Sequence, residues 1–195
     1  KYALLSVAIP KSYSNEDLKE LAKGFKKAAS EFGIEIIGGD TISNEKLDIS
    51  VTIISKVSNP IYRKGMNKGD ILCYTGTLGL CKIYLERLFK NKEVPKKSKF
   101  IKPILNADFF YEIAPLITTS MDISDGLFFE LERLSKANKL GFEFFHKIDE
   151  EIGTSGEEYE ILFSFNENNL EKIKKIALKH KVKLNPFAKA VKGKY

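Results

Sequence analysis

The chain has 195 residues, of which 43% are hydrophobic and 30% are charged. These proportions are typical of a folded globular protein with a sizeable core and exclude a disordered polypeptide. No apolar run is long enough to cross a bilayer and no signal peptide pattern is present, so we expect no membrane partner. The two cysteines, Cys73 and Cys81, have neither zinc-site nor CxxC spacing, so we expect reduced thiols and a cytoplasmic location.

The formal net charge is +6, which favours anionic partners in general. The densest basic run, Lys90 to Lys102, holds six lysines around Pro95. It lacks the aromatic interleaving and the motifs that nucleic-acid readers carry, so we expect a solvated loop and no nucleic-acid partner.

The first third of the chain predicts a strand, a helix and two further strands. Ser14 with Asp17 three residues later forms a capping box, and Gly33 closes the helix that follows. The next strand is expected to be short and to break at Gly38-Gly39-Asp40. From Leu47 onward apolar and polar residues alternate, which predicts a long strand with one polar face. The expected strands cover residues 2–9, 34–37 and 47–57.

A polar segment with Pro60 and two glycines, residues 58–69, is the best candidate linker. It predicts two domains, residues 1–58 and 59–195. Strands and helices alternate along the second part, so the fold class is α/β or α+β, with mixed sheets packed against helices. Expected strands there are 70–74, 114–120, 142–145, 158–165 and 187–191, and expected helices are 80–89, 107–114, 127–138 (ended by Gly141) and 166–181.

The stretch Met121 to Leu127, MDISDGL, lies where a buried strand leads into a helix. Two aspartates, Asp122 and Asp125, bracket Ser124. A helix start presents free N–H donors that suit phosphate, and carboxylates are the hard ligands that magnesium prefers. One hypothesis is therefore a metal-bridged phosphate site. The alternative is structural, with Ser124 as the N-cap and Asp125 complementing the helix dipole.

Other short motifs point in the same direction. Gly38-Gly39-Asp40 lets the backbone approach a ligand closely and puts a carboxylate within reach of a metal, although a plain turn explains it equally. Arg63 in the linker is either a surface charge or a phosphate-binding fork. Gly156 to Glu160, GEEYE, is either a solvated loop or a source of carboxylates, Glu157 or Glu158, for a cationic substrate.

Several kinds of catalytic machinery are missing from the sequence. It contains no GxxxxGK[ST] loop, no GxGxxG after a strand and no set of protein-kinase motifs. The two histidines, His146 and His180, are isolated, and no Ser/His/Asp or Cys/His arrangement is apparent. Nucleophilic catalysis is therefore not predicted.

Five motifs in order resemble thiamine-monophosphate kinase, a family of the aminoimidazole ribonucleotide synthetase-like superfamily. They cover nearly the whole chain, and together they are far more specific than any one alone. The motifs are GGDT at Gly38, the stretch from Arg63 to Asp70, TGTLG at Thr75, DISDGL at Asp122 and GEEYEILF at Gly156.

The resemblance implies ATP-dependent phosphorylation of thiamine monophosphate to thiamine diphosphate, with magnesium as cofactor. By family resemblance, Asp40, Asp122 and Asp125 match magnesium ligands. Further matches are ATP contacts at Gly39, Asp40, Arg63 and Ser124, and a substrate contact at Glu157. No catalytic residue is implied beyond these metal and phosphate ligands.

The resemblance also implies a two-domain fold and a homodimer. Residues 1–58 would be the C-terminal part of the N-terminal ATP-binding and dimerisation domain, so we expect the first domain to be incomplete in this chain. Two alternatives stay open. One is another ATP-using synthetase of the superfamily, similar to selenophosphate synthetase or to the hydrogenase-maturation enzyme, and the other is a non-catalytic basic α/β module.

Overall fold

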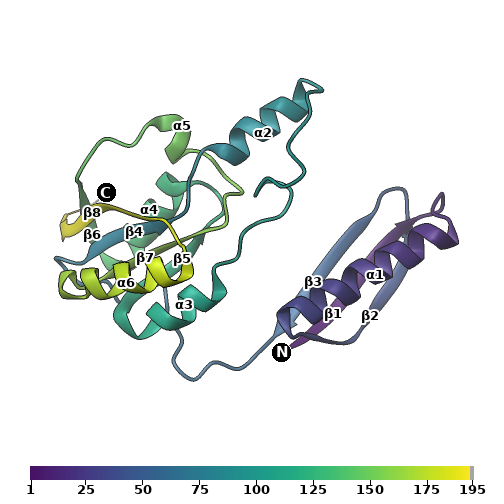
Figure 1. Ribbon diagram of the computed structural model, residues 1–195, viewed down its shortest axis with the longest axis horizontal. Coiled ribbons are helices and arrows are strands. Elements are labelled where there is room, and N and C mark those ends of the chain that lie inside the picture. Colours follow the sequence, from purple (N-terminus) through teal and green to yellow (C-terminus); the bar gives the residue numbers. More distant parts are fainter. Residues whose placement is uncertain (194–195) are drawn as a thin grey trace. The chain divides into compact units, whose positions relative to one another are not determined.

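The computed structural model describes residues 1–193 and divides into two compact units, residues 1–60 and 61–195 (Figure 1). Each unit has its own sheet. The first sheet has three strands in the order β2-β1-β3, and the second has five in the order β5-β7-β4-β8-β6.

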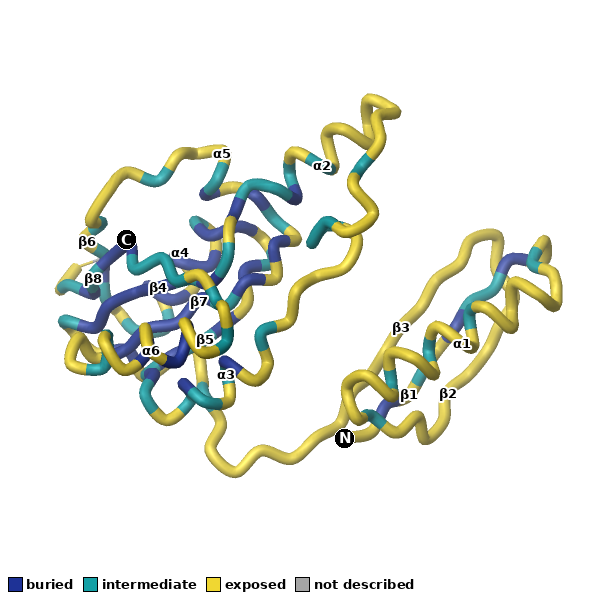
Figure 2. Tube along the Cα trace, viewed as in Figure 1, coloured by how far each residue is buried: buried dark blue, intermediate teal, exposed yellow. Residues whose placement is uncertain are grey.

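The first unit is a β-α-β unit with one added strand. Strand β1 (Tyr2–Pro10) leads through helix α1 (Asn15–Phe32) to β2 (Glu35–Asn44), which pairs with β1 in parallel; β3 (Asp48–Ile54) pairs with β1 antiparallel. The predicted capping box is confirmed, since Ser14 and Asp17 bond reciprocally, and Gly33 ends the helix in the left-handed conformation. Only a few side chains of the unit are buried, whereas β2 and β3 are exposed throughout (Figure 2).

The prediction that the second strand breaks at Gly38-Gly39-Asp40 is wrong, and so is the alternative of a plain turn there. Strand β2 continues through all three residues to Asn44. The register with β1 shifts between Ala3 and Leu4, opposite the glycines, and Gly39 has φ 152°. A bulge at flexible glycines therefore lets the ladder continue where the local sequence favours a stop.

The second unit is a five-stranded sheet in which every neighbouring pair is antiparallel, with helices on both faces. Its strands are β4 (Ile71–Thr75), β5 (Ile117–Ile123), β6 (Leu140–Phe144), β7 (Glu160–Phe165) and β8 (Leu184–Lys192). Its helices are α2 (Leu80–Phe89), α3 (Ala107–Ile113), α4 (Leu127–Asn138), α5 (Glu150–Gly153) and α6 (Leu170–His180).

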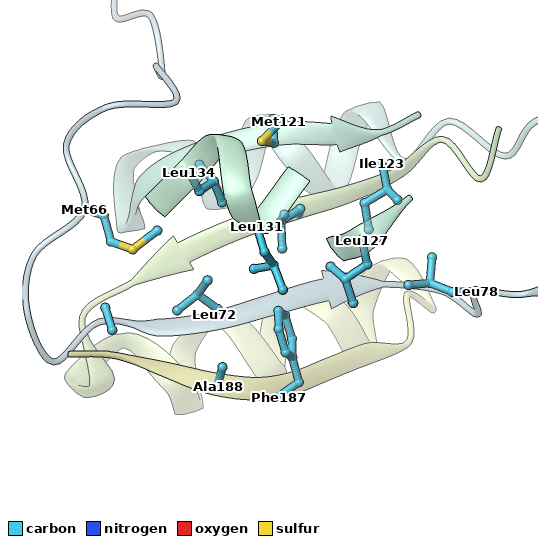
Figure 3. Close-up of a cluster of buried hydrophobic side chains, with 12 residues drawn as sticks. Met66, Leu72, Leu78, Met121, Ile123, Leu127, Leu131, Leu134, Phe187 and Ala188 are labelled. Carbon is cyan, nitrogen blue, oxygen red and sulfur yellow. The ribbon is translucent and has the colours of Figure 1, made fainter. Parts of the chain in front are cut away.

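The core of this unit lies in two layers. On one face Leu127, Leu131 and Leu134 of α4 pack against Leu72 and Phe187 of the sheet, as Figure 3 shows. On the other face α3 and α6 pack against alternate residues of β4 and β7. The buried members of this cluster are Ile71, Cys73, Phe109, Ile113, Ile117, Phe163, Phe165, Ile173, Ile176 and Ala177. The central strands β4 and β7 are therefore covered on both sides, which fixes their register.

Several predicted boundaries in this unit are wrong; β8, for example, begins at Leu184 rather than Phe187. Strand β5 begins at Ile117 rather than Ala114, because residues 114–116 form a 3₁₀ turn that continues α3. Helix α4 ends at Asn138 with Lys139 in the left-handed conformation, so Gly141 is not its terminator but part of β6. Helix α6 begins at Leu170, after a separate 3₁₀ turn whose Asn166 side chain accepts from the Asn168 amide.

Candidate active site

Three of the sequence motifs meet at one end of the five-stranded sheet. Strands β5 and β4 both end there, and β7, which lies between them and runs the opposite way, begins there. The register pairs Ile123 with Glu160, so DISDGL and GEEYE are adjacent. Thr75 of TGTLG donates from its hydroxyl to Glu160 Oε2 at 2.7 Å and accepts from the Ile161 amide at 3.0 Å. Antiparallel pairing thus joins motifs that are far apart in the sequence.

The DISDGL junction is a short turn between β5 and α4. The structure rejects Ser124 as the N-cap: the cap position is Gly126, which has φ 105° and no side-chain cap. A Cβ on Gly126 would lie 3.1 Å from the Gly153 carbonyl oxygen, so close packing also favours glycine there. Asp122 therefore lies near the end of β5, Ser124 and Asp125 belong to the turn, and both aspartates are exposed.

Two residues of α4 that the motif analysis missed hold this turn. The buried carboxylate of Glu130 accepts from the Asp125 amide at 3.2 Å, and Arg133 donates to both Glu130 oxygens at 2.9 Å. Arg133 also pairs with Asp125, with 2.6 Å between Nη2 and Oδ2. The hydrogen bonds to Asp125 and then to Glu130 raise the pKa of Arg133. The i, i+3 spacing of Glu130 and Arg133 on a helix is the signal that could have revealed them.

GEEYE is bonded through its backbone to the end of β5. The Glu157 amide donates to the Ser124 carbonyl at 2.7 Å, and the Tyr159 amide donates to the Ile123 carbonyl at 2.9 Å. A Cβ on Gly156 would lie 2.9 Å from the Ser124 carbonyl oxygen, so the close approach needs a glycine. The structure therefore brings Glu157 next to Ser124, in the segment that also carries Asp122 and Asp125.

Glu157 and Tyr159 both have a left-handed backbone, with φ 56° and 52°. Such conformations are uncommon for non-glycine residues and gather at functional sites. The Tyr159 hydroxyl donates to Glu157 Oε2 at 2.6 Å. That hydrogen bond, partial burial and the charges of Glu157, Asp122 and Asp125 raise the pKa of Tyr159. Tyr159, which the sequence did not single out, therefore contacts Glu157 directly, and the negative charges of Asp122 and Asp125 add to the rise of its pKa.

A pocket of about 420 Å³ opens beside this cluster. Its wall comes from β5, from the start of β7 and from α3 with the residues before it, and includes Asn106, Phe110, Tyr111, Asp122, Tyr159 and Ile161. The lining combines aromatic rings with a carboxylate, and the volume suits a small-molecule ligand.

The remaining predicted residues lie elsewhere. The Arg63 carbonyl accepts from the Asn138 side chain at 2.9 Å, which holds the Arg63 backbone at the end of α4, while its side chain is exposed. Gly39 and Asp40 are in the first unit, beside a pocket of about 450 Å³, and Asp40 accepts from the Thr41 amide at 2.8 Å. Tyr195, whose contribution to substrate binding the sequence leaves open, lies outside the described residues.

Within residues 1–193, no group of three or more His, Cys, Asp or Glu side chains is placed to hold a metal ion. Of the predicted magnesium ligands, the second unit contains Asp122 and Asp125, two exposed carboxylates on either side of Ser124. Their hard oxygen donors fit magnesium, which ordinarily keeps several water or phosphate oxygens in its coordination sphere. None of the helices described in residues 1–193 combines the length and the apolar character that spanning a bilayer requires.

Comparison with known proteins matches residues 1–57 to the family model "AIR synthase related protein, N-terminal domain". A thiamine-monophosphate kinase of Nitrosopumilus maritimus is 30% identical over 196 residues, covering 91% of this chain and 63% of that relative. The chain thus spans less than two thirds of the length of that relative.

Solved structures agree in fold. The structure of AaThiL complexed with AMPPCP and TMP superposes with a TM-score of 0.84 at 23% identity, over 100% of this chain and 68% of that one. E. coli HypE, a hydrogenase maturation protein, superposes with a TM-score of 0.77 at 17% identity, over 100% and 68%. The predicted resemblance is confirmed as a similarity: the chain is similar in sequence to a thiamine-monophosphate kinase over 91% of its length, and it shares its fold with AaThiL and HypE.

Proposed function

We propose that this protein catalyses the ATP-dependent phosphorylation of thiamine monophosphate to thiamine diphosphate. The observation that carries the proposal is the backbone pairing that joins GEEYE, with Glu157, to the end of β5 and the DISDGL segment, which carries Asp122 and Asp125. The similarity to a thiamine-monophosphate kinase supports it, as does the fold shared with AaThiL, whose structure holds AMPPCP and TMP.

The chemistry of this reaction suits a site without a histidine base. The acceptor is a phosphate oxygen that is already ionised at neutral pH, so no proton has to be removed before attack. The difficulty is that two anionic phosphate groups must be aligned against their repulsion. Magnesium, held by Asp40, Asp122 and Asp125 in this proposal, would neutralise that charge when bound.

The residues of the chain then have distinct tasks. In this proposal Gly39, Asp40, Arg63 and Ser124 contact the nucleotide. Glu157 faces the cationic thiamine. Arg133 holds Asp125 in place through its ion pair, and Asp125 is one of the residues that would hold magnesium.

We further propose that the protein is a homodimer that pairs through its first unit. Strands β2 and β3 carry apolar side chains that are 40–60% exposed, among them Ile36, Ile42, Val51 and Ile53. A three-stranded sheet with so much exposed apolar area favours association with a second surface. Analytical ultracentrifugation tests the homodimer, since a monomer at micromolar concentration would reject the proposal.

The free thiols of Cys73 and Cys81 support a reducing compartment such as the cytoplasm.

The kinase proposal is tested by incubating the full protein with ATP, magnesium and thiamine monophosphate and measuring thiamine diphosphate. The matched variants are Asp122→Asn and Glu143→Gln, each of which removes one exposed carboxylate from a strand while keeping its size. We expect Asp122→Asn to lower kcat by at least about 100-fold, as loss of one electrostatic stabiliser does. Glu143→Gln, on β6, should leave the rate unchanged. A folded wild-type protein that makes no product rejects the proposal.

The similarity in fold to HypE favours a second candidate function, that of another ATP-using enzyme of the same superfamily. A panel of acceptors separates the two. Turnover of ATP with a different acceptor and none with thiamine monophosphate would favour this second candidate.

A further inference from the structure

Lys99 is the one lysine of the run from Lys90 to Lys102 whose side chain the structure buries between carboxylates, with 7% of it exposed. Its ammonium nitrogen lies 2.6 Å from Glu158 Oε2 and 2.8 Å from Glu160 Oε1. It donates hydrogen bonds to the Thr77 carbonyl at 2.6 Å and to Glu160, whereas its contact with Glu158 Oε2 is an ion pair without hydrogen-bond geometry. The two glutamate side chains are 0% and 6% exposed.

Glu158 extends this cluster to α2. Its Oε1 accepts from the Gly79 amide at 2.7 Å, the Cys81 amide at 3.2 Å and the Ser155 hydroxyl at 2.6 Å. Free amides at a helix start need such an acceptor, because α2 has no side-chain cap of its own at Gly79. Glu158 thus joins the TGTLG turn to GEEYE.

Alternate residues of GEEYE therefore have different partners. Glu158 and Glu160 contact Lys99, whereas Glu157 and Tyr159 bond through their amides to the end of β5. Because the left-handed backbone at positions 157 and 159 is strained, it persists only where its surroundings hold it. The contacts of Glu158 and Glu160 add a side-chain restraint to the backbone bonds that Glu157 and Tyr159 make with β5.

Lys99 supplies the positive charge between the two buried carboxylates of Glu158 and Glu160. Two buried carboxylates repel each other and lose hydration, and a cation between them offsets both effects. Burial opposes the charge on Lys99, but its contacts with Glu158 and Glu160 outweigh that effect and raise its pKa. Lys99 therefore stays protonated at neutral pH and binds both glutamates together.

We infer that Lys99 is a positioning residue that locks GEEYE in the conformation in which Glu157 meets the substrate. The substrate contact of Glu157 in this inference rests on the proposed function. The restraint of GEEYE by Lys99 does not, and it can be measured without turnover. Through Lys99, the otherwise exposed loop around Pro95 is tied to the site.

The test compares Lys99→Met with Lys97→Met in the full protein. Both replace a lysine of the same loop by an uncharged chain of similar length, but Lys97 is exposed. We expect Lys99→Met to raise the KM for thiamine monophosphate by about 10- to 100-fold, as misplacement of a contact does, and the KM for ATP by less than about threefold. Lys97→Met should match the wild type in both.

Amide hydrogen exchange gives the readout that does not depend on activity. In Lys99→Met the amides of Glu157 and Tyr159 should exchange at least about tenfold faster, while that of Ile176 in α6 keeps its rate. A wild-type protein without kinase activity whose Lys99→Met variant still shows this local change would reject the proposed function and leave the locking role intact. Unchanged exchange at both amides overturns the inference.

A double variant, Lys99→Met with Glu160→Gln, separates positioning from general stability. Removing one carboxylate relieves the uncompensated negative charge, so the melting temperature should recover towards that of the wild type. The bridge stays broken, so the KM for thiamine monophosphate should stay high. Recovery of both quantities would mean that Lys99 acts only through stability and would overturn the positioning role.

Discussion

Glu130 is the residue on which the geometry of the aspartate turn depends most directly. Its side chain is completely buried, and it accepts from the Asp125 amide and twice from Arg133. Replacing Glu130 by alanine removes these three bonds and also the longer one, 3.5 Å, from the Ser124 hydroxyl. The Asp125 amide then has no acceptor, and Arg133 keeps only its contact with Asp125.

The cost can be estimated from these contacts. Leaving a partly buried donor unpaired costs about 1–3 kcal/mol. The larger penalty of a broken buried ion pair does not apply, because Arg133 is 45% exposed and water can solvate its charge. For a unit of this size we expect the melting temperature to fall by about 3–12 °C. Glu130→Gln, which keeps an acceptor of the same shape, should lose less.

Differential scanning calorimetry of the full protein measures this change, and titration with ATP and magnesium reports on the turn. The matched control is Glu132→Ala on the same helix, where the carboxylate is 49% exposed and a change should stay within about 0.5 kcal/mol. Glu130→Ala with the melting temperature of the wild type would refute the idea that this carboxylate holds the turn.

Two further predictions concern the glycines of β2 and the cysteines. Gly39→Ala should destabilise the first unit by about 1–3 kcal/mol and weaken ATP binding, because a Cβ there would overlap a backbone carbonyl of β1. The control is Gly38→Ala, whose Cβ would make an ordinary contact at 3.5 Å and which should cost less than about 1 kcal/mol. Equal losses of stability for the two variants in calorimetry would contradict this prediction. Burial raises the pKa of Cys73 to about 12, and burial with the Glu158 carboxylate raises that of Cys81 to about 11. The folded state therefore keeps protons that the unfolded chain releases near pH 9.0, so stability should fall as the pH rises from there, and neither thiol should react with a disulfide reagent at pH 8 before denaturation.

The elements that the sequence predicted best are those with a strong local signal. The capping box at Ser14, the left-handed Gly33 and the alternation in β3 each act within a few residues. No neighbour from a distant part of the chain has to be known for such features to form.

The errors came where pairing between distant segments overrides a local preference. Gly38 and Gly39 favour a turn, but β1 provides a complete ladder, and a bulge lets β2 follow it. Ser124 is a good N-cap by composition, yet pairing with β7 extends β5 as far as Ile123 and moves the helix start to Leu127. Strand pairing is a tertiary effect and cannot be seen in local composition.

The same limit applies to the site. The sequence named Ser124, Asp125 and Glu157, but the contact between Glu157 and Ser124 follows from the register of β5 and β7. Lys99 looked like one more member of a solvated run, because the carboxylates that bury it come about 60 residues later. The predicted convergence of Asp40 with the other aspartates stays a prediction.

The central place of β7 determines when this site can form during synthesis. β7 is made after the other two strands that carry site motifs, β4 and β5, and it has to insert between them. Pairings over such long sequence separations fold slowly. A nascent chain that stops before residue 165 already contains both aspartates of DISDGL, but not the complete strand that brings Glu157 and Tyr159 to them. The grouped carboxylates are therefore a late product of folding, and the ribosome must release most of the second unit before they exist.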